Sequence, residues 1–257
     1  MIPVALSIAG SDPSGGAGLQ ADLKTFHRYK VYGMAVVTLL TAQNTQGVRA
    51  VYPVSSLQVA RQLEVVLSDI LPGAAKIGAL GNEKIIQVVA ACVRKFSFPL
   101  VIDPVMISKH GARLLPRYAV HAFIKRLLPL ATLVTPNLCE AEALSGLRVR
   151  DVESMEKAAR IISRFGPRAV LVKGGHLEGA ALDLFYQDGR IHCFKAPRIR
   201  TQHTHGTGCT YSAAITAGLA QGKDLFGAIA SAKRFIARAI RTAPGLGHGV
   251  GPVNHFA

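Results

Sequence analysis

Several features that define whole classes of protein are absent from this chain of 257 residues. Its four cysteines are scattered, without the spacing of a metal site and without a secretory context, so reduced thiols in a cytoplasmic protein are expected. No apolar run reaches the length of a membrane span. The first residues lack a basic segment and are expected to form a strand, not a signal peptide. No linker, repeat or low-complexity segment is visible, which predicts one domain over residues 1–257.

Acidic residues are also scarce, because 15 Asp and Glu stand against 30 Lys and Arg, which gives a net charge of +15. The basic residues form no block of five or six, and no recognised nucleic-acid module is present. We therefore expect neither nucleic acid nor membrane as a partner, and the charge favours anionic substrates such as nucleotides. The densest basic group is spaced as one stripe of a late helix, for which a solvated face is the expected explanation: Lys233, Arg234, Arg238 and Arg241.

What the chain does contain is a regular alternation of apolar, β-branched runs with amphipathic runs. Strands are predicted over 2–8, 34–40, 75–77, 100–102, 131–135, 169–172, 181–186 and 191–196. Helices are predicted over 18–29, 56–69, 82–95, 116–127, 138–144, 152–165, 209–221 and 225–242. Asp188-Gly189 between the last two strands is typical of a hairpin turn. The pattern predicts an α/β fold with a mostly parallel central sheet, helices on both faces and a late hairpin.

Polar segments follow five of the predicted strands, at the edge where ligands of such sheets bind. The segments are 9–12, 41–44, 103–104, 136–137 and 173–176. Each alone is typical of an ordinary loop, but packing does not readily explain five of them together. We therefore expect the segments that begin near residues 10, 43, 103, 137, 173 and 206 to converge on one cleft.

The segment Gly206-Thr207-Gly208-Cys209 carries the strongest chemical signal, since it opens a helix of small and apolar residues. Two glycines permit a tight turn and close approach to a ligand, and the N–H groups at a helix start favour an anion. A thiol at that position has its pKa lowered and can act as a base or nucleophile. The combination is suited to phosphoryl transfer. The alternative is a packing pair of glycines beside an inert cysteine.

A glycine-rich loop over residues 10–18 joins a predicted strand to a helix. It lacks the Gly-Lys-Ser/Thr of a Walker A loop and the spacing of a dinucleotide fingerprint. It is either a close-approach loop beside a small substrate or a plain strand-to-helix turn. Asp22, one turn into the helix, either faces the same pocket or complements the helix dipole.

Oxygen-bearing side chains offer a place for Mg²⁺, which needs few protein ligands because it keeps most of its waters. Asp103 ends an apolar strand and could hold the ion or cap a helix. Asn137 and Glu140 stand three residues apart, so they could orient a hydrated ion against a triphosphate, form an N-terminal capping box, or do both. Lys173, before two glycines, suits a phosphate contact. His203 and His205 have no evident third partner for a metal site.

Ordered motifs along the chain resemble those of the bacterial hydroxymethylpyrimidine/phosphomethylpyrimidine kinases of thiamine synthesis. The resemblance extends from about residue 4 to about residue 255 and is carried by 7–26, 41–45, 76–78, 103–106, 135–137 with Glu140, 173–176, 204–210 and 247–252. It implies a ribokinase-like, three-layer α/β/α fold. It also implies ATP-dependent phosphorylation of 4-amino-5-hydroxymethyl-2-methylpyrimidine, and then of its monophosphate to the diphosphate.

The same resemblance implies roles for individual residues. Gln43 would hydrogen-bond the pyrimidine edge and its amino group, and a second set would line that pocket: Gly10, Asp22 and Val105. Cys209 stands where most ribokinase-like enzymes carry an aspartate base. Asn137 and Glu140 fall on the magnesium-associated motif of the superfamily. Lys173 and the turn of Gly206, Thr207 and Gly208 would face the ATP phosphates.

Two rival functions stay open at this point. A pyridoxal-kinase-like branch shares the glycine turn and the cysteine, and residues 43–45 favour the pyrimidine enzyme. The rival from another class is a non-catalytic pyrimidine-binding module, and an extra domain of the kind found in fusions is not expected. His110 and Ala112 replace small or acidic residues expected around a flexible lid. The resemblance also implies a homodimer.

Overall fold

The computed structural model describes residues 2–109, 111–175 and 179–257, and within them nine strands form one sheet in the order β3-β2-β1-β4-β5-β6-β7-β8-β9. The strands are β1 (Val4–Ser11), β2 (Tyr32–Asn44), β3 (Gly47–Pro53), β4 (Ala74–Ile77), β5 (Leu100–Ile102), β6 (Leu133–Val134), β7 (Val170–Gly174), β8 (Ala181–Gln187) and β9 (Arg190–Ala196). The six strands from β2 to β7 in this order are parallel, and β3, β8 and β9 pair antiparallel at the two ends.

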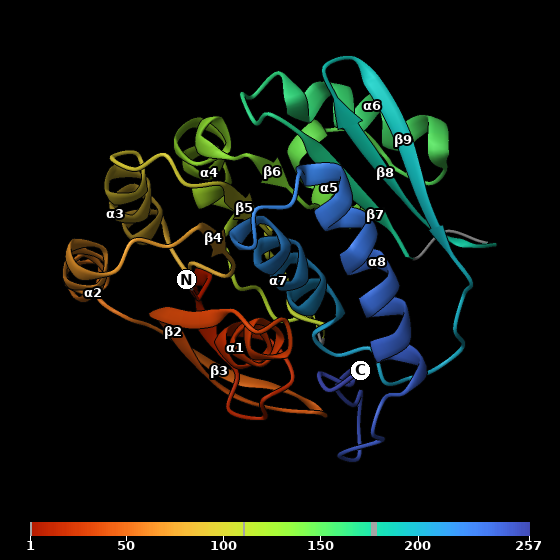
Figure 1. Cartoon of the computed structure of the whole chain (residues 1–257), viewed down its shortest axis with the longest axis horizontal. Coiled ribbons are helices and arrows are strands. Elements are labelled where there is room, and N and C mark those ends of the chain that lie inside the picture. The colour runs from red at the N-terminus through yellow and green to blue at the C-terminus, as the bar shows by residue number, and fades with distance from the viewer. Residues whose placement is uncertain (1, 110, 176–178) are drawn as a thin grey trace.

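Helices cover both faces of the sheet and give the predicted three layers (Figure 1). One face carries α2 (Ser56–Asp69), α3 (Glu83–Val93), α4 (Val120–Arg126), α5 (Leu138–Ser145) and α6 (Val152–Ser163). The other carries α1 (Gly18–Arg28), α7 (Thr207–Ala220) and α8 (Leu225–Arg241). Two 3-10 helices, Arg117–Ala119 and Leu128–Leu130, flank α4.

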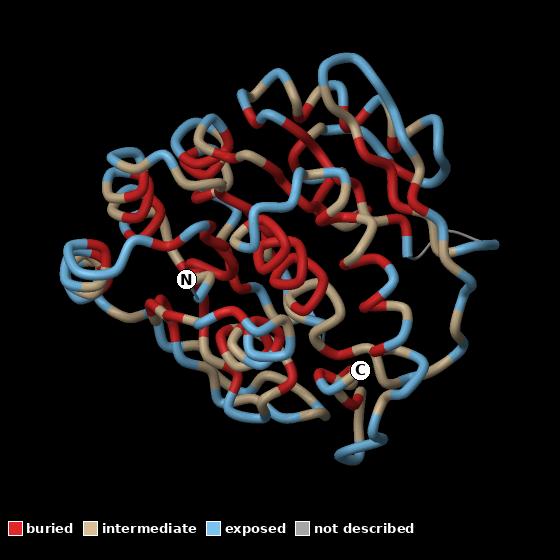
Figure 2. The backbone as a smooth tube through the Cα atoms, in the orientation of Figure 1, coloured by how far each residue is buried: buried red, intermediate tan, exposed pale blue. Residues whose placement is uncertain are grey.

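Alternating apolar side chains explain why both faces of the central strands are covered. Leu100 and Ile102 of β5 pack in the core beneath α2–α6, whereas Val101 packs in the core beneath α7 and α8. The central helix α7 lies between α1 and α8 and is buried along most of its length (Figures 1 and 2). No helix among the described residues combines the length and hydrophobicity that crossing a membrane would require.

Local signals in the sequence fix the starts of several helices. The side chains of Ser55, Asn82, Asn137, Asp151 and Asp224 each accept a hydrogen bond from a main-chain N–H of the first turn that follows. Such caps satisfy N–H groups that have no partner within the helix, and each contributes roughly 1 kcal/mol.

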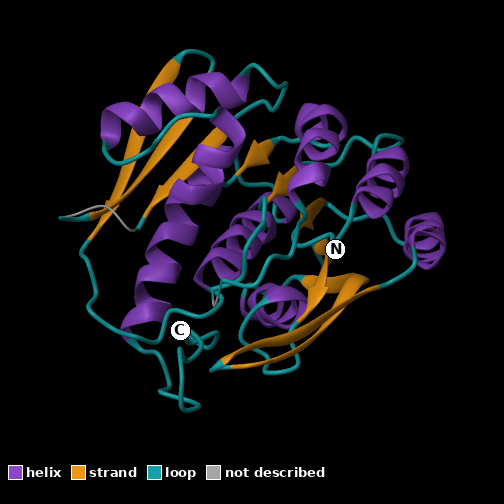
Figure 3. Cartoon of the chain, turned by 180° about the vertical axis from the view of Figure 1, so that it is seen from behind, coloured by secondary structure: helices purple, strands orange, loops and turns teal. Residues whose placement is uncertain are grey.

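The late hairpin is confirmed, with Asp188 and Gly189 at φ values of +49° and +78° in the turn between β8 and β9. A second hairpin, at the opposite edge of the sheet, is not among the predicted elements. The expected loop over residues 41–44 is wrong, because β2 continues through them and pairs with β3. The two strands form the long ribbon visible at one edge in Figure 3. β3 is half-exposed along its length, so it lacks the apolar run by which strands were recognised.

Candidate functional site

The six polar segments meet at the carboxyl ends of the parallel strands, as the sequence predicted. The glycine-rich loop packs on the segment before α7, because a Cβ at Gly206 would overlap the carbonyl oxygen of Gly16. A Cβ at Gly208, farther along, would lie 3.3 Å from Lys173 Nζ. The main-chain N–H of Lys173 donates to Pro136 O at 2.8 Å, which joins β7 to the segment before α5.

The start of α7 is built from Gly206 as N-cap and Thr207 as first helical residue. Gly206 adopts φ +77°, a left-handed conformation, and its close contact with Gly16 leaves no space for a side chain. Among the described residues no side chain caps this helix. The Thr207 N–H donates to Thr204 O at 3.3 Å, so it is the N–H groups of the next residues in the first turn that an anion could reach. Thr207 Oγ1 donates to Thr204 O at 2.8 Å, which turns this hydroxyl back toward the preceding loop.

Asp12 organises the glycine-rich loop. Its carboxylate accepts hydrogen bonds from the main-chain N–H groups of Ser14, Gly16 and Ala17 at 2.8–3.2 Å. Burial disfavours the charge of Asp12, but the contacts with His205 and Ser14 outweigh burial and lower the pKa of the carboxyl. The loop is therefore tied to an ionised, buried carboxylate that the sequence did not single out.

Gln43 is connected to that carboxylate through His205. Its Nε2 lies 3.2 Å from His205 Nε2, which lies 2.8 Å from Asp12 Oδ2. The β2–β3 hairpin, the glycine-rich loop and the segment before α7 are thus joined by three side chains. His205 is buried among protein groups, and within the described part of the chain it belongs to no cluster of three side chains that could hold a metal ion.

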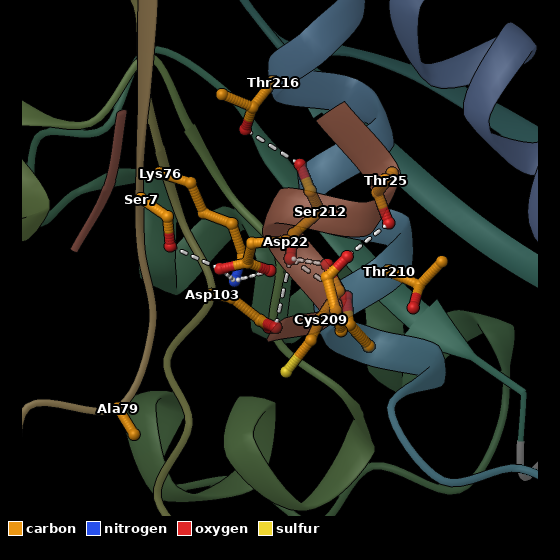
Figure 4. A network of polar contacts seen from close by, with 12 residues as sticks. Ser7, Asp22, Thr25, Lys76, Ala79, Asp103, Cys209, Thr210, Ser212 and Thr216 are labelled. Carbon is orange, nitrogen blue, oxygen red and sulfur yellow. Dashed lines mark hydrogen bonds and ion pairs between the residues drawn. The ribbon is translucent and has the colours of Figure 1, made fainter. Parts of the chain in front are cut away.

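A buried ion pair lies beneath the site, on the α1 and α7 side of the sheet. Lys76 Nζ of β4 contacts both carboxylate oxygens of Asp22 at 2.8 Å, and Ser7 Oγ donates to the same carboxylate (Figure 4). Asp22 and Lys76 have no exposed surface. Asp22 therefore supports the site from below in this structure and does not line its surface, which corrects the pocket-lining position expected for it.

Cys209, the third residue of α7, lies beside this ion pair (Figure 4). The expected low thiol pKa is wrong. Cys209 keeps partial exposure, yet the protein packed around its side chain desolvates the thiol and raises its pKa to about 11. The charge of Lys76 and a hydrogen bond from Gly18 N–H act in the opposite direction. The helix start does not overcome this desolvation, so the thiol is protonated at neutral pH.

Lys173 and Asp103 form a second ion pair, with Nζ 2.7 Å from Oδ1. Asp103 Oδ2 accepts from Ser212 Oγ of α7 at 3.2 Å. Burial works against ionisation of Asp103, but Lys173 and Lys76 outweigh burial and lower the pKa of its carboxyl. The pair places one positive and one negative group beside the N-terminal turn of α7.

Asn137 and Glu140 form a reciprocal capping box at the start of α5. Asn137 Oδ1 accepts from Glu140 N–H at 2.9 Å, and Glu140 Oε2 accepts from Asn137 N–H at 2.8 Å. Burial, opposed by the charge of Lys173 and reinforced by that of Asp103, raises the pKa of Glu140 to about 7. Asp103 and Glu140 thus both lie near Lys173, and a cation bound beside them would favour the ionised form of Glu140.

The carboxylates of the site suit contacts with the water shell of a Mg²⁺ ion better than direct coordination of the ion. Asp103 is engaged by Lys173 and Ser212, and Glu140 by main-chain N–H groups of Asn137 and Met106. The described residues contain no group of three carboxylate, imidazole or thiol side chains spaced to hold a metal. A hydrated ion bound mainly by the phosphates of a nucleotide agrees with this donor set.

Two residues expected at the substrate pocket have packing roles in the structure. A Cβ at Gly10 would approach Leu39 Cδ1 to 2.5 Å, so glycine is required there by close packing of β1 on β2. Val105 is half-buried against the small core of Leu39, Ala79 and Leu114. His110 and His176, named in the sequence motifs, lie outside the described residues.

The model of the phosphomethylpyrimidine kinase family matches residues 12–254, nearly the whole chain and every segment of the site. The chain belongs to this family. It is 49% identical to the hydroxymethylpyrimidine/phosphomethylpyrimidine kinase of Rhizobium meliloti, and the alignment covers 100% of this chain and 98% of that one. The family assignment makes the chain a kinase, that is, a phosphotransferase.

Solved structures support the ribokinase-like fold. The pyridoxal kinase from Staphylococcus aureus, in complex with AMP-PCP and pyridoxal, is 40% identical with a TM-score of 0.93, covering 100% of this chain and 94% of that one. The phosphomethylpyrimidine kinase from Clostridium difficile 630 is 43% identical with a TM-score of 0.82, covering 92% and 99%. The kinase assignment and an ATP-type phosphate donor agree with these neighbours.

No role was predicted from the sequence for Lys76, Asp12 or Ser212, although Asp12 lies in one of the polar segments and Lys76 in one of the motifs that carry the resemblance. A buried ion pair at Lys76 could have been predicted from the sequence, because a lysine within the apolar strand Ala74–Ile77 must be buried and therefore needs a carboxylate partner. Asp12 and Ser212 carried no such signal, since an aspartate in a glycine-rich loop and a serine in a helix are common in ordinary loops and helices.

Proposed function

We propose that this kinase transfers the γ-phosphoryl group of ATP to 4-amino-5-hydroxymethyl-2-methylpyrimidine, and then to the resulting monophosphate, in thiamine biosynthesis. The family match over residues 12–254, together with the contact of all six predicted segments, carries the proposal. The single sheet that runs through these segments supports one kinase domain over residues 1–257. A module without catalysis would not require this combination of an open helix start, a lysine and a thiol.

In the proposed reaction, the N–H groups at the start of α7 and Lys173 bind the phosphates of the nucleotide. The substrate hydroxyl oxygen attacks the γ-phosphorus, a new P–O bond forms, and the bond from that phosphorus to ADP breaks. The hydroxyl proton passes to the sulfur of Cys209 in the small fraction of molecules that carry it as thiolate, since the thiol is mainly protonated at neutral pH. Gln43, next to His205, holds the edge of the pyrimidine ring.

We further propose that Asp103, Asn137 and Glu140 orient a hydrated Mg²⁺ against the phosphates. When bound, Mg²⁺ neutralises charge that develops on the transferring group. The two buried carboxyl groups near Lys173, those of Asp103 and Glu140, support this role.

Pyridoxal is the second candidate substrate, because a pyridoxal kinase in complex with pyridoxal superposes on this chain with a TM-score of 0.93. Both compounds present a hydroxymethyl group on a flat heterocycle, so the same thiol and phosphate-binding groups would serve either. The identity to the pyrimidine kinase of Rhizobium meliloti, 49%, is higher than the 40% to this pyridoxal kinase, which favours the pyrimidine.

ADP release, measured with each compound as sole acceptor, decides between the candidates. We expect kcat/KM for the hydroxymethylpyrimidine to exceed that for pyridoxal by at least about tenfold, because a site built to pair with the amino group of the pyrimidine leaves its own polar groups unpaired with pyridoxal. The reverse preference would assign the chain to the pyridoxal branch. If no ADP is released with either acceptor, the binding-module alternative would be supported.

Replacing Gln43 by alanine is expected to raise KM for the pyrimidine by about tenfold or more while KM for ATP changes less than about twofold. The reason is that the Gln43 side chain, on the β2–β3 hairpin, contacts His205, whereas Lys173, the proposed phosphate contact, pairs with Asp103. Initial-rate kinetics with each substrate varied in turn measures the two values. Arg49→Ala, an exposed position on the same hairpin, is the matched control. Equal increases in both KM values would contradict the assignment of Gln43 to the pyrimidine.

We also propose a cytoplasmic homodimer. Free thiols at all four cysteines support a reducing compartment. Large apolar side chains exposed near the β2–β3 edge of the sheet support a contact between two copies of the chain: Leu40, Tyr52 and Leu57.

A further inference from the structure

A second concave site lies between the far end of α1 and the middle of α8. It is a hollow of about 350 Å³ that is open to solvent, called the cavity below, and its lining residues are Arg28, Tyr29, Lys30, Ser231, Arg234, Phe235 and Arg238. None of these residues belongs to the segments that form the kinase site. Helix α1 begins at Gly18 beside the glycine-rich loop and has 11 residues, so its other end is roughly 16 Å away along the helix axis.

The lining contains four cationic side chains and no acidic one. None of the four forms an ion pair with an Asp or Glu in the part of the chain that the structure describes. Arg28 Nε donates instead to a carboxylate oxygen of the terminal residue Ala257 at 2.9 Å, so it has an anionic partner of another kind. Lys233, which the sequence placed in the same basic stripe, is buried and pairs with Asp183 at 2.6 Å. Of the four members of the stripe, Lys233 is therefore paired inward, Arg234 and Arg238 line this cavity, and Arg241 is exposed outside it.

Aromatic rings add an apolar wall to the positive charge. Tyr29 and Phe235 pack edge to face with ring centroids 5.3 Å apart, and the Arg238 guanidinium lies 6.0 Å from the centre of the Phe235 ring. The solvated helix face expected from the sequence would have neither a cavity nor arginines from one helix opposite basic residues from another. The volume lies within the range of sites for small molecules, which combine an apolar wall with a few convergent polar groups.

We propose that this cavity binds a small molecule that carries two or more phosphate groups. Arginine guanidinium groups match phosphate oxygens in pairs, and four cations around one concave volume, with no acidic side chain among them, favour a multiply charged anion over a singly charged one. The concave shape between two helices favours a small ligand over an extended nucleic-acid strand. The proposal does not depend on the identity of the kinase substrate, because the two sites share no residue.

Titration calorimetry with inorganic tripolyphosphate, at fixed ionic strength and with the full chain, tests the proposal. The double variant Arg234→Gln/Arg238→Gln is expected to weaken one tripolyphosphate site by at least about tenfold, since each lost charge-assisted contact lowers affinity. Lys30→Gly is expected to weaken it less, and it suits the backbone, because Lys30 has φ +56°. The matched control Arg61→Gln/Arg126→Gln removes the same charge from exposed positions elsewhere and is expected to change affinity less than about twofold.

The variant Lys173→Met distinguishes tripolyphosphate binding at the kinase site from binding at the proposed site. It removes a phosphate contact of the kinase site and is expected to leave the affinity of the proposed site within about twofold. Kinase turnover is expected to be unchanged in the double variant, which also shows that it folds. Equal weakening in the Arg61/Arg126 control would mean that net charge alone attracts the anion and would overturn the proposal. The proposal would also be overturned if no tripolyphosphate site were weakened in the Arg234/Arg238 double variant. A third contrary result would be a wild-type protein that binds short single-stranded DNA through these arginines but does not bind tripolyphosphate.

Discussion

Cys209→Ala is expected to lower kcat for phosphorylation of the hydroxymethylpyrimidine by about 10²–10⁴-fold, the range typical for loss of a general base. The KM values for both substrates should change little, because in the proposed reaction the substrate edge and the phosphates are bound by other groups, namely Gln43, Lys173 and the N–H groups of α7. Steady-state kinetics measures both parameters. Cys193→Ala, on the outer strand β9, is the matched control and should keep normal turnover.

The second phosphorylation provides an internal test within the same variant. The attacking oxygen of the monophosphate carries little proton at neutral pH, because the second ionisation of a phosphate monoester has a pKa of about 6. A base at Cys209 is then unnecessary, and we expect Cys209→Ala to slow this step less than about tenfold. Equal losses with the two acceptors would show that Cys209 acts by positioning both substrates and not by accepting a proton.

The raised pKa of Cys209 also gives this prediction a pH signature. Below a pKa of about 11 the thiolate fraction increases about tenfold for each pH unit, so kcat for the first phosphorylation should increase from pH 7 to pH 9. The Cys209→Ala variant should lack this increase. A wild-type rate that is independent of pH, with chemistry shown to be rate-limiting, would remove the thiolate from the mechanism.

The sequence was most informative where one local pattern dictates the structure. Alternating apolar runs predicted the central parallel strands, since residues such as Leu100, Val101 and Ile102 must be buried on both sides. Asp188-Gly189 predicted the late hairpin because the type I′ turn of two-residue hairpins requires positive φ at both central residues, which Asp-Gly readily adopts. Strand β3 escaped prediction because it is an edge strand with half-exposed residues, stabilised by pairing with β2 and not by burial.

In the candidate site, too, some features follow from the sequence pattern and others depend on three-dimensional packing. The meeting of five of the six segments could be predicted from topology, because the carboxyl ends of parallel strands share one edge. The sixth, near residue 206, precedes helix α7 and not a strand end, and its place was predicted from its chemistry. The thiol pKa could not be predicted in this way, since a helix start lowers it while burial raises it, and only the three-dimensional packing around Cys209 decides which effect is larger. The stripe beginning at Lys233 likewise divides into buried and exposed members only through Asp183, 50 residues earlier in the chain.

The largest effect on stability is expected from Lys76→Met, which leaves Asp22 buried without its positive partner. Removal of one member of a buried ion pair costs about 3–5 kcal/mol, because the remaining charge is desolvated and uncompensated. Chemical denaturation followed by circular dichroism measures the free energy of unfolding. The exposed pair of Lys157 and Glu153 has the same chemistry and a distance of 2.7 Å, so Lys157→Met is the matched control and should have little effect.

The double variant Asp22→Asn/Lys76→Met should recover part of this loss, because it removes the orphaned charge while Ser7 keeps a polar partner. The single variant should also show a particular pH dependence. Burial raises the pKa of Asp22, and loss of Lys76 removes the main opposing influence, so the folded-state pKa lies above the unfolded value. A raised folded-state pKa means that stability is lost as pH increases through it and regained as the carboxyl is protonated at lower pH. Lys76→Met should therefore be closer to the wild type at pH 5 than at pH 8, whereas a defect caused only by lost packing would be the same at both values and would persist in the double variant.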